Sequence, residues 1–321
     1  MSSQGPKSGR TRRPGGDAYA RFADAERRYF ARHGVEFRER FLELRDPPLE
    51  ARVVETGQGQ PVLMLHGGGG SLTQWGPLMA ELGGFRMIAV DRPGCGLSSG
   101  FNYRGVDLRR HAEAFVASVL DGLELERVPI VANSMGGLWA LWFALQSPER
   151  VTRLALLGCP ALILETSAPA PMRLLSLRGL NALMVRMQRP SPKAMRGTFK
   201  MMGHSDDSLD RQPPEFWESG ALMSALPTYW PGFLTLIENV LTVRRARFNL
   251  GEDDLRRVQQ PTLFVWGERD AFGGPQYARR AVELMPHASL EMLPAGHLPW
   301  LDEPAACGRS VGPFLRGSGP A

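Results

Sequence analysis

Short, largely apolar runs recur along this chain of 321 residues. Each predicts a strand, because a continuous apolar run is typical of a strand that is covered on both faces. These runs lie at 61–66, 86–91, 128–133, 151–158, 261–267 and 289–293. Stretches with apolar residues at helical spacing lie at 74–82, 105–122, from Ser134 onward, at 276–285 and at 303–315. Strands that alternate with helices predict parallel β–α–β units in one doubly covered sheet.

The first part of the chain adds a helix and two more strands. Residues 17–33 carry apolar positions at roughly helical spacing, and Gly34 follows as a helix-ending residue. Residues 37–44 mix apolar and charged positions in the manner of a half-buried strand. A further strand is predicted at 51–55, before the turn at 57–59. The expected fold is therefore α/β, with a mostly parallel sheet of eight strands covered by helices.

The alternation breaks between Pro160 and Asn249. This stretch is rich in Met, Arg and Pro, has no apolar strand run and contains several helical segments. An insertion of this kind, placed after the sixth strand, predicts a helical lid over a site. The expected division of the chain is a disordered basic tail at 1–16, a core at 17–160 and 250–321, and a lid at 161–249.

The charge of the chain is concentrated at its start. The formal net charge is +5, and the first sixteen residues hold Lys7, Arg10, Arg12 and Arg13 without any acid. Removing these four leaves the rest of the chain near +1. A basic tail, and not a basic surface, therefore explains the high pI, and we expect no nucleic-acid partner.

The number and spacing of the three cysteines bear on the compartment of the protein and on whether it has disulfides or a cysteine metal site. Cys95, Cys159 and Cys307 are far apart and odd in number, which suits a reducing compartment and gives no disulfide framework or metal-ligand spacing. The N-terminal segment lacks an apolar run behind its charges, and no run approaches the ~18 residues that span a bilayer. We expect a cytoplasmic protein with no membrane partner.

The segment 128–138 carries the first candidate for chemistry. It predicts a strand, a sharp turn at Ser134 and then a helix, with small residues on both sides of the serine: Ala132, Asn133, Gly136 and Gly137. Such a turn lifts the hydroxyl above the sheet and aims a helix N-terminus at the bound group, which favours developing negative charge. An ordinary tight turn would show the same small residues, so the motif alone leaves both interpretations open.

Four glycines follow the strand at 61–66, at its carboxyl end, where open α/β sheets place their sites. The loop 66–71 allows close approach of the backbone to a ligand. It lacks the Lys-Ser/Thr ending of a phosphate-binding loop. An oxyanion hole is the better interpretation, with the N–H of Met135 as one donor and that of Gly68 as the other, Gly69 being the alternative second donor. His66 is expected to help to shape this loop.

A serine nucleophile needs a base, and the chain has six histidines. Of these, His297 lies in a glycine-containing loop directly after the last predicted core strand, whereas the others lie in helices, in the lid, in a polar turn or before the glycines. Asp270 follows the preceding strand and is the expected carboxylate that orients the base, with Glu268 as its nearest competitor. The order Ser134, Asp270, His297 is the order of hydrolase triads of this type.

Taken together, these motifs resemble the α/β-hydrolase family, whose nucleophile elbow usually reads Gly-x-Ser-x-Gly; Ala132 stands here for the first glycine. The resemblance covers about 58–158 and 258–304, and the segment 91–98 looks like the family's loop after the fourth strand. The glycine loop and the elbow are similar to the branch that includes carbon–carbon bond hydrolases of aromatic meta-cleavage products. In that branch a tryptophan follows the catalytic histidine, whereas here Leu298 does.

The expected function is hydrolysis of a carboxylic ester or lactone through an acyl-enzyme, with Ser134, Asp270 and His297 as the triad. The alternatives are a carbon–carbon bond hydrolase of meta-cleavage-type diketone acids, or a ligand-binding member of the fold without turnover. Neither a metal nor an organic cofactor is expected, the partner is a small-molecule carbonyl compound, and the oligomeric state stays open. Gly69, Trp75 and Trp139, together with Phe101, are expected at the substrate.

The predicted lid offers two kinds of candidate contact. Apolar residues in it suggest an adaptable wall for a substrate, although packing onto the core would use the same residues: Met172, Leu174, Leu175, Met184, Met187, Met201 and Met202. Its arginines suggest a carboxylate partner, although a solvated face is the simpler interpretation: Arg173, Arg178, Arg186, Arg189 and Arg196.

Overall fold

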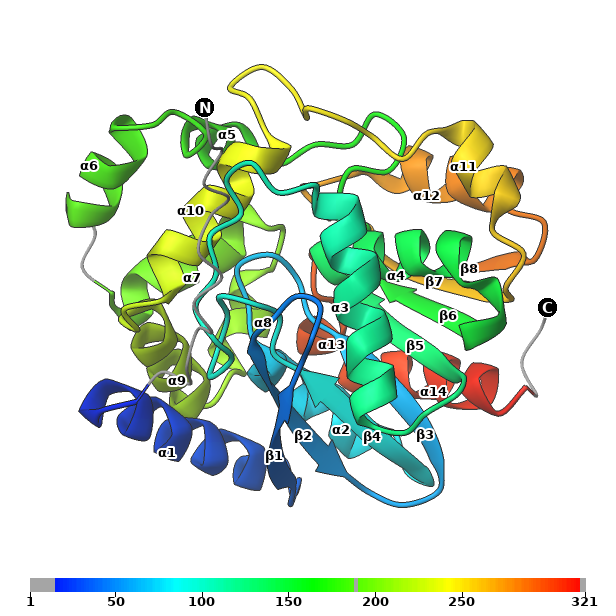
Figure 1. Cartoon of the computed structure of the whole chain (residues 1–321), viewed down its shortest axis with the longest axis horizontal. Coiled ribbons are helices and arrows are strands. Elements are labelled where there is room, and N and C mark those ends of the chain that lie inside the picture. Colours follow the sequence, from blue (N-terminus) through cyan, green and yellow to red (C-terminus); the bar gives the residue numbers. More distant parts are fainter. Residues whose placement is uncertain (1–14, 188–189, 318–321) are drawn as a thin grey trace, which may run out of the picture.

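The structure, a computed structural model, describes residues 15–187 and 190–317, so most of the predicted disordered tail lies outside the described residues. Its centre is one eight-stranded sheet in the order β1-β2-β4-β3-β5-β6-β7-β8 (Figure 1). The strands are β1 (Arg38–Glu43), β2 (Glu50–Thr56), β3 (Gln60–Leu65), β4 (Phe85–Val90), β5 (Val128–Asn133), β6 (Val151–Leu157), β7 (Thr262–Gly267) and β8 (Ala288–Leu293). Strand β2 pairs antiparallel with β1 and β4, and the other pairs are parallel. The predicted fold class is confirmed.

Helices cover both faces of this sheet, and alternate residues of each central strand face opposite cores. Leu63 and Leu65 of β3 belong to the core under α3 (Leu108–Gly122), α4 (Met135–Gln146) and α12 (Pro275–Leu284). Val62 and Met64 belong to the core under α2 (Gly76–Glu81), α13 (Pro299–Asp302) and α14 (Pro304–Arg316). The short helix η1 (Leu72–Trp75) precedes α2, and η2 (Pro148–Arg150) precedes β6. Every residue of β5 and β7 is buried, as their apolar runs predict.

Among the described residues of 161–249, where the sequence predicts a lid, there are six helices: α5 (Ala170–Leu174), α6 (Leu180–Met187), α7 (Pro192–Met201), α8 (Asp206–Asp210), α9 (Pro214–Ser224) and α10 (Tyr229–Val240). We call residues 161–249 the insertion. Helix α1 (Asp17–Arg32) packs against α9, where the rings of Tyr29 and Phe216 lie 5.6 Å apart (Figure 1). Helix α11 (Glu252–Arg257) was not predicted, since Leu255 is its one buried residue. Within the described ranges, no helix combines the length and the apolar character needed to cross a bilayer.

A buried charge network ties α1 to the edge of the sheet and to two loops. The guanidinium of Arg52 on β2 contacts the carboxylates of Glu26, Glu39 and Asp91, and the side chain of Arg52 is 1% exposed. Asp91, directly after β4, also accepts hydrogen bonds from the N–H groups of Leu72 (2.9 Å) and Leu97 (3.0 Å). Because Leu72 begins η1, which follows the loop after β3, and Leu97 lies in the loop after β4, this one carboxylate holds both segments in place.

Replacing Arg52 with methionine will destabilise the protein by about 3–5 kcal/mol, because it leaves the carboxylates of Glu26 and Asp91 buried without their cation. Urea unfolding followed by circular dichroism measures this change. The matched control is Arg40→Met, which removes a guanidinium that is 42% exposed and paired with Glu55; an exposed pair contributes only ~0–1 kcal/mol. Equal effects of the two substitutions would contradict the importance of the network.

Candidate active site

Ser134 lies on a strained turn between β5 and α4, as the sequence predicts. Its φ is +52° and its ψ is −116°, a backbone conformation that a residue other than glycine rarely adopts. A Cβ added to Gly136 would lie 2.2 Å from the carbonyl oxygen of Leu65. Only glycine therefore allows the new helix to pass this close to the end of β3. The carbonyl of Ser134 accepts hydrogen bonds from the N–H groups of Leu138 (3.0 Å) and Ala161 (2.9 Å), which hold the turn.

His297 and Asp270 meet at the same edge of the sheet. Nδ1 of His297 lies 2.8 Å and 3.0 Å from the two carboxylate oxygens of Asp270. The carboxylate also accepts hydrogen bonds from the N–H groups of Cys159 (2.7 Å) and Phe272 (2.9 Å), so it is buried with its oxygens occupied. The competitor Glu268 is exposed and takes no part. Asp270 is thus the carboxylate that fixes the orientation of this imidazole.

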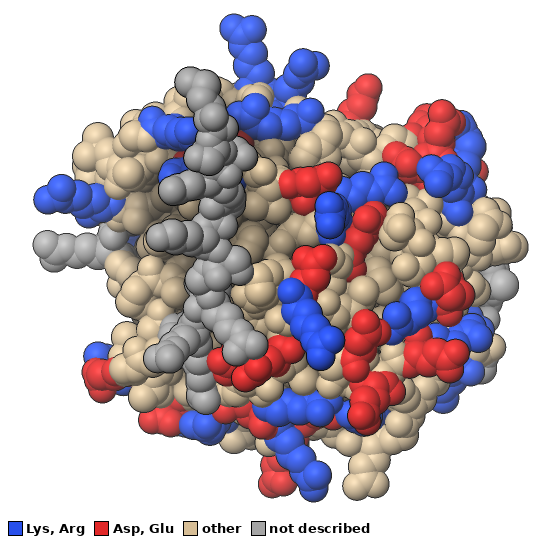
Figure 2. Space-filling view, viewed as in Figure 1, with Lys and Arg blue, Asp and Glu red and all other residues tan. Residues whose placement is uncertain are grey.

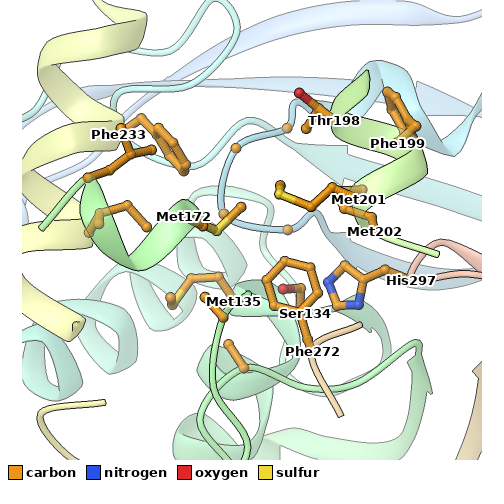
Figure 3. Close-up of a pocket in the computed structure, with 18 of the residues that line it drawn as sticks. Ser134, Met135, Met172, Thr198, Phe199, Met201, Met202, Phe233, Phe272 and His297 are labelled. Carbon is orange, nitrogen blue, oxygen red and sulfur yellow. The ribbon is translucent and has the colours of Figure 1, made fainter. Parts of the chain in front are cut away.

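The other nitrogen of His297, Nε2, is buried and has no hydrogen-bond partner among the residues that the structure describes. Ser134 and His297 line the same cavity (Figure 3). In the absence of substrate, hydrogen bonds between such groups are often long and shorten when the substrate binds. The free Nε2 is therefore an unoccupied acceptor in the cavity that holds the Ser134 hydroxyl.

The position of the imidazole is fixed by contacts that the sequence analysis did not identify. The ring of Phe272 stacks on that of His297, with centroids 4.0 Å apart and planes at 23°. The backbone N–H of His297 donates to the carbonyl of Met202 (3.0 Å) and its carbonyl accepts from Nδ2 of Asn133 (3.1 Å). Phe272 follows Asp270 by two residues, and this closeness in the sequence is the one feature that could have predicted its contact with His297.

The glycine loop after β3 is shaped by the buried side chain of Arg92. Its guanidinium donates to three successive carbonyl oxygens, those of His66 (3.0 Å), Gly67 (2.6 Å) and Gly68 (3.2 Å). Its Cζ lies 4.9 Å from the ring centroid of Trp139. Nε2 of His66 accepts from the N–H of Arg92 (2.9 Å). Burial, reinforced by the charge of Arg92, holds the pKa of His66 well below its usual value, so the ring is neutral.

This arrangement leaves peptide N–H groups free for an oxyanion. Because the carbonyls of the loop are turned to Arg92, the N–H of Gly68 has no partner within the described part of the chain. A Cβ added to Gly68 would lie 3.8 Å from the Cβ of Met135, so these two predicted donors lie on facing segments. Met135 begins α4, where the first N–H groups of a helix lack partners within it. The geometry suits a pair of donors beside Ser134.

A second buried pair connects the insertion to the loop that holds His297. Nδ1 of His204, which follows α7, lies 2.8 Å from Oδ2 of Asp302, and that oxygen accepts from the N–H of Gly296 (2.7 Å). Nε2 of His204 accepts from the N–H of Leu298 (3.4 Å). Burial opposes ionisation of Asp302, but its contacts with His204, Ser208 and Gly296 outweigh burial and lower its pKa. From the sequence, His204 is a histidine of the predicted lid with no assigned role.

The cavity above Ser134 has a volume of about 470 Å³ and is lined mainly by apolar side chains of the insertion (Figure 3). Of the apolar residues named in the predicted lid, Met172, Leu175, Met184, Met201 and Met202 line it. No Asp, Glu, Lys or Arg is among its described lining residues. The predicted arginine contact with a substrate carboxylate therefore finds no support in the described lining. Gly69, an expected substrate contact, does line the cavity.

Three of the expected substrate contacts, Trp75, Trp139 and Phe101, lie outside the cavity lining. Trp75 and Trp139 are 0% exposed and do not line the cavity. Trp75 stacks on Trp300 with centroids 4.4 Å apart, and Trp139 packs between Phe115 and the guanidinium of Arg92. Both indoles are therefore used to fill the cores on the two faces of the sheet. Phe101 is also outside the lining, since it packs on Tyr103 and His111.

Residues 60–304 match the sequence profile of the alpha/beta hydrolase fold. This chain belongs to the α/β-hydrolase fold family. The protein is a hydrolase, as the sequence resemblance predicts. Among the described residues, no group of three or more His, Cys, Asp or Glu side chains is placed to hold a metal ion.

Curated relatives are named for one kind of reaction. A 2-hydroxy-6-oxononadienedioate/2-hydroxy-6-oxononatrienedioate hydrolase from Cupriavidus pinatubonensis is 29% identical over 290 residues, which cover 86% of this chain and 94% of that protein. A 2-hydroxy-6-oxo-6-phenylhexa-2,4-dienoate hydrolase from Burkholderia cepacia is 30% identical over 257 residues, which cover 76% of this chain and 83% of that protein.

Solved structures with the same fold include a meta-cleavage product hydrolase from Pseudomonas fluorescens (TM-score 0.70, 20% identity, covering 87% of this chain and 98% of that one) and proteins with other names. A carboxylesterase from Bacillus subtilis superposes with a TM-score of 0.73 at 21% identity, covering 94% of this chain and 99% of that one. An enol-lactonase from Burkholderia xenovorans superposes with a TM-score of 0.68 at 20% identity, covering 86% of this chain and all of that one (100%). At such identities the likeness shows the fold alone.

Replacing Arg92 with methionine will lower kcat by about 10²–10³-fold, the effect of losing one oxyanion donor, because the carbonyls of the glycine loop lose their partner. KM will change little, since Arg92 does not line the cavity. Steady-state kinetics measure both constants. Arg92→Lys keeps the charge and one donor, and it should recover part of kcat. A variant that is folded by circular dichroism and has wild-type kcat would contradict this role.

Proposed function

We propose that this hydrolase acts through Ser134 as nucleophile, His297 as base and Asp270 as the carboxylate that orients the base. The observation that carries the proposal is the buried His297–Asp270 pair, at 2.8 Å, beside a serine on a strained elbow in the same cavity. Asp270 holds the proton on Nδ1 of the neutral imidazole, so Nε2 is the nitrogen that is free to accept a proton.

The reaction proceeds in two halves. His297 takes the proton of the Ser134 hydroxyl while its oxygen attacks the carbonyl carbon of the substrate, and the N–H groups of Gly68 and Met135 stabilise the oxyanion. The intermediate collapses, the leaving group takes the proton from His297, and the acyl group stays on Ser134 as an ester. Water then attacks this ester, its proton goes to His297, and the Ser134 hydroxyl is restored as the acid departs.

Two candidate reactions differ in the bond that is cleaved: a carbon–carbon bond of a diketone acid, or the ester bond of a carboxylic ester or lactone. The names of the relatives favour cleavage of the carbon–carbon bond. The curated relatives are named as hydrolases of 2-hydroxy-6-oxo dienoates, and this supports cleavage of a carbon–carbon bond in a vinylogous diketone better than it supports the ester hydrolysis that the sequence favoured. In that reaction the leaving group is a carbon that carries the electron pair, and it has to receive its proton on carbon.

The lining of the cavity favours the second candidate, an uncharged carboxylic ester or lactone. A substrate carboxylate in an apolar cavity needs a cation or several hydrogen-bond donors, because an unpaired buried charge is costly. The described lining has no Lys or Arg, and its polar side chains include neutral ones such as Gln74, Thr198 and Ser224. A dienoate acid bound here would depend on neutral donors of this kind.

Ser134→Ala will abolish turnover with the fold retained, and Asp270→Asn will lower kcat by about 10⁴-fold because the imidazole then adopts the wrong tautomer. The Ser134→Ala variant should match the wild-type stability within about 0.5 kcal/mol, since alanine keeps the same backbone strain. The Asp270→Asn variant should lose about 1–3 kcal/mol, because its amide nitrogen cannot accept from the backbone N–H groups that bond to Asp270. Unchanged turnover of the Ser134→Ala variant on a substrate that the wild type cleaves would disprove the assigned nucleophile.

Parallel assays on a coloured ring-fission dienoate and on p-nitrophenyl esters of increasing acyl length will separate the two candidates. Carbon–carbon cleavage predicts bleaching of the dienoate with a kcat/KM above that for the esters. Ester hydrolysis predicts the reverse order, with an optimum at a chain that fills the cavity. The methyl ester of the dienoate is the matched control: if charge limits binding, it will have a lower KM than the free acid.

A further inference from the structure

The exposed apolar side chains of this protein gather on one face of the insertion. Among the described residues, the exposed large apolar ones are Leu174 (39% exposed), Leu177 (41%), Leu180 (41%), Leu183 (55%), Met187 (76%) and Val243 (37%). They belong to α5, the turn between α5 and α6, α6 itself and the loop after α10. Nε of Arg173 donates to the carbonyl of Val243 (3.1 Å), which places that loop against α5. We call residues 174–187 and 243–245 the apolar-basic face.

The same helices line the cavity from their other side. Met172 and Leu175 of the α5 segment and Met184 of α6 line the cavity above Ser134, while Leu174 and Leu183 are exposed. This part of the insertion is therefore one helix thick, with apolar side chains on both of its surfaces. A contiguous exposed apolar patch on a globular protein marks a site of interaction.

The charges around this face have one sign. Residues 166–205 contain seven Lys or Arg and no Asp or Glu. Some of these cations are neutralised by acids of other segments, as Arg178 is by Glu238 (2.9 Å) and Arg196 by Asp206 (2.7 Å). Arg173 donates to the backbone carbonyls of Val243 and Ala168. Exposed cations with no acidic partner in the described ranges remain at Arg186, Lys193, Arg244 and Arg245. Figure 2 shows Lys and Arg side chains projecting at the edge over α5 and α6.

The positive charge of the apolar-basic face indicates which kind of partner could bind to it. A second copy of the same face would bring cations against cations, and the N-terminal segment, with Lys7, Arg10, Arg12 and Arg13, is itself basic. We propose that the apolar-basic face docks on an anionic lipid surface, with its leucines and Met187 among the acyl chains and its cations at the headgroups. Apolar residues interspersed with Lys and Arg on short surface helices suit this environment, because the basic side chains reach back to the interface.

This inference differs from the sequence prediction of no membrane partner. That prediction rested on the lack of an apolar run long enough to span a bilayer, whereas a helix that lies in the interface needs no such run. Docking would place the layer that roofs the cavity against the lipid, so that a lipophilic substrate reaches Ser134 without crossing water. The docking does not depend on the proposed function, because it is tested by measuring how much protein binds to lipid vesicles and not by measuring hydrolysis.

Co-sedimentation with vesicles tests the proposal on the full chain. We expect the protein to bind vesicles of phosphatidylcholine with about 30% phosphatidylglycerol at low salt, and pure phosphatidylcholine at least tenfold more weakly, since each cation near an anionic surface contributes about fivefold to partitioning. The Ser134→Ala variant should bind as the wild type does. Failure to bind anionic vesicles at low salt would overturn the proposal, whatever the outcome of the hydrolase assays.

Paired variants distinguish this face from attraction by net charge alone. Arg186→Glu with Arg244→Glu should weaken binding at least tenfold. The control pair, Arg127→Glu with Arg279→Glu, changes net charge equally at exposed positions on other elements and should have a much smaller effect. Leu180→Ser with Leu183→Ser should weaken binding also at high salt. Lys7, Arg10, Arg12 and Arg13 changed together to Gln should leave most of the binding. Equal losses from both Glu pairs, or loss with the tail variant alone, would contradict docking by this face.

A fluorescent label reports insertion directly. Cys95, Cys159 and Cys307 are buried, so Leu183→Cys offers an accessible thiol for an environment-sensitive dye. Its emission should shift to the blue on anionic vesicles, whereas the same dye at Arg127→Cys should not shift. A blue shift at position 183 that depends on protein concentration in the absence of lipid would show self-association instead and would overturn the proposal.

Discussion

The strained backbone at Ser134 is the constraint on which the rest of the site depends. A positive φ on a residue with a side chain costs about 1–3 kcal/mol, so its surroundings have to compensate. They do so through the two hydrogen bonds to the Ser134 carbonyl and through the close approach of Gly136 to the end of β3. The approach is possible because β3 and β5 are neighbours in the sheet. The strand order thus determines where the serine can stand.

The insertion does more than cover this site. Its segment at Met202–His204 bonds to the loop of His297, through the Met202 carbonyl and through the His204–Asp302 pair. The position of the imidazole is therefore coupled to the packing of the insertion. Met195, Met201 and Met202 line the cavity from the same segment, and methionine adapts to different shapes more readily than branched side chains do. Selection of the substrate and placement of the base depend on one structural unit.

The names of the relatives refer to substrates that carry a carboxylate. The described cavity lining of this chain has no Lys or Arg side chain that could pair with such a carboxylate. The members of the family share the elbow and the sheet, so those elements carry no information about the bond that is cleaved. That information resides in the cavity wall, which comes from the insertion. An apolar wall around the proposed triad suits a neutral carbonyl compound, and the exposed face of the same helices suits the lipid surface proposed as its docking partner. The apolar cavity wall and the apolar-basic face are consistent with one kind of substrate, although different residues form them.

By itself, the sequence determined the α/β class, the eight strands and the positions of Ser134, Asp270 and His297 after the ends of core strands, because each of these strands is a short pattern that is local in the chain. The sequence did not predict the roles of residues whose neighbours in the fold lie far away in the chain. Trp75 and Trp139 look like substrate contacts but fill the cores, and Arg92, Phe272 and Asp302 carry no local signal of their neighbours. Helix periodicity in the insertion shows which residues are apolar, but only tertiary packing decides which of them face the cavity and which face outward.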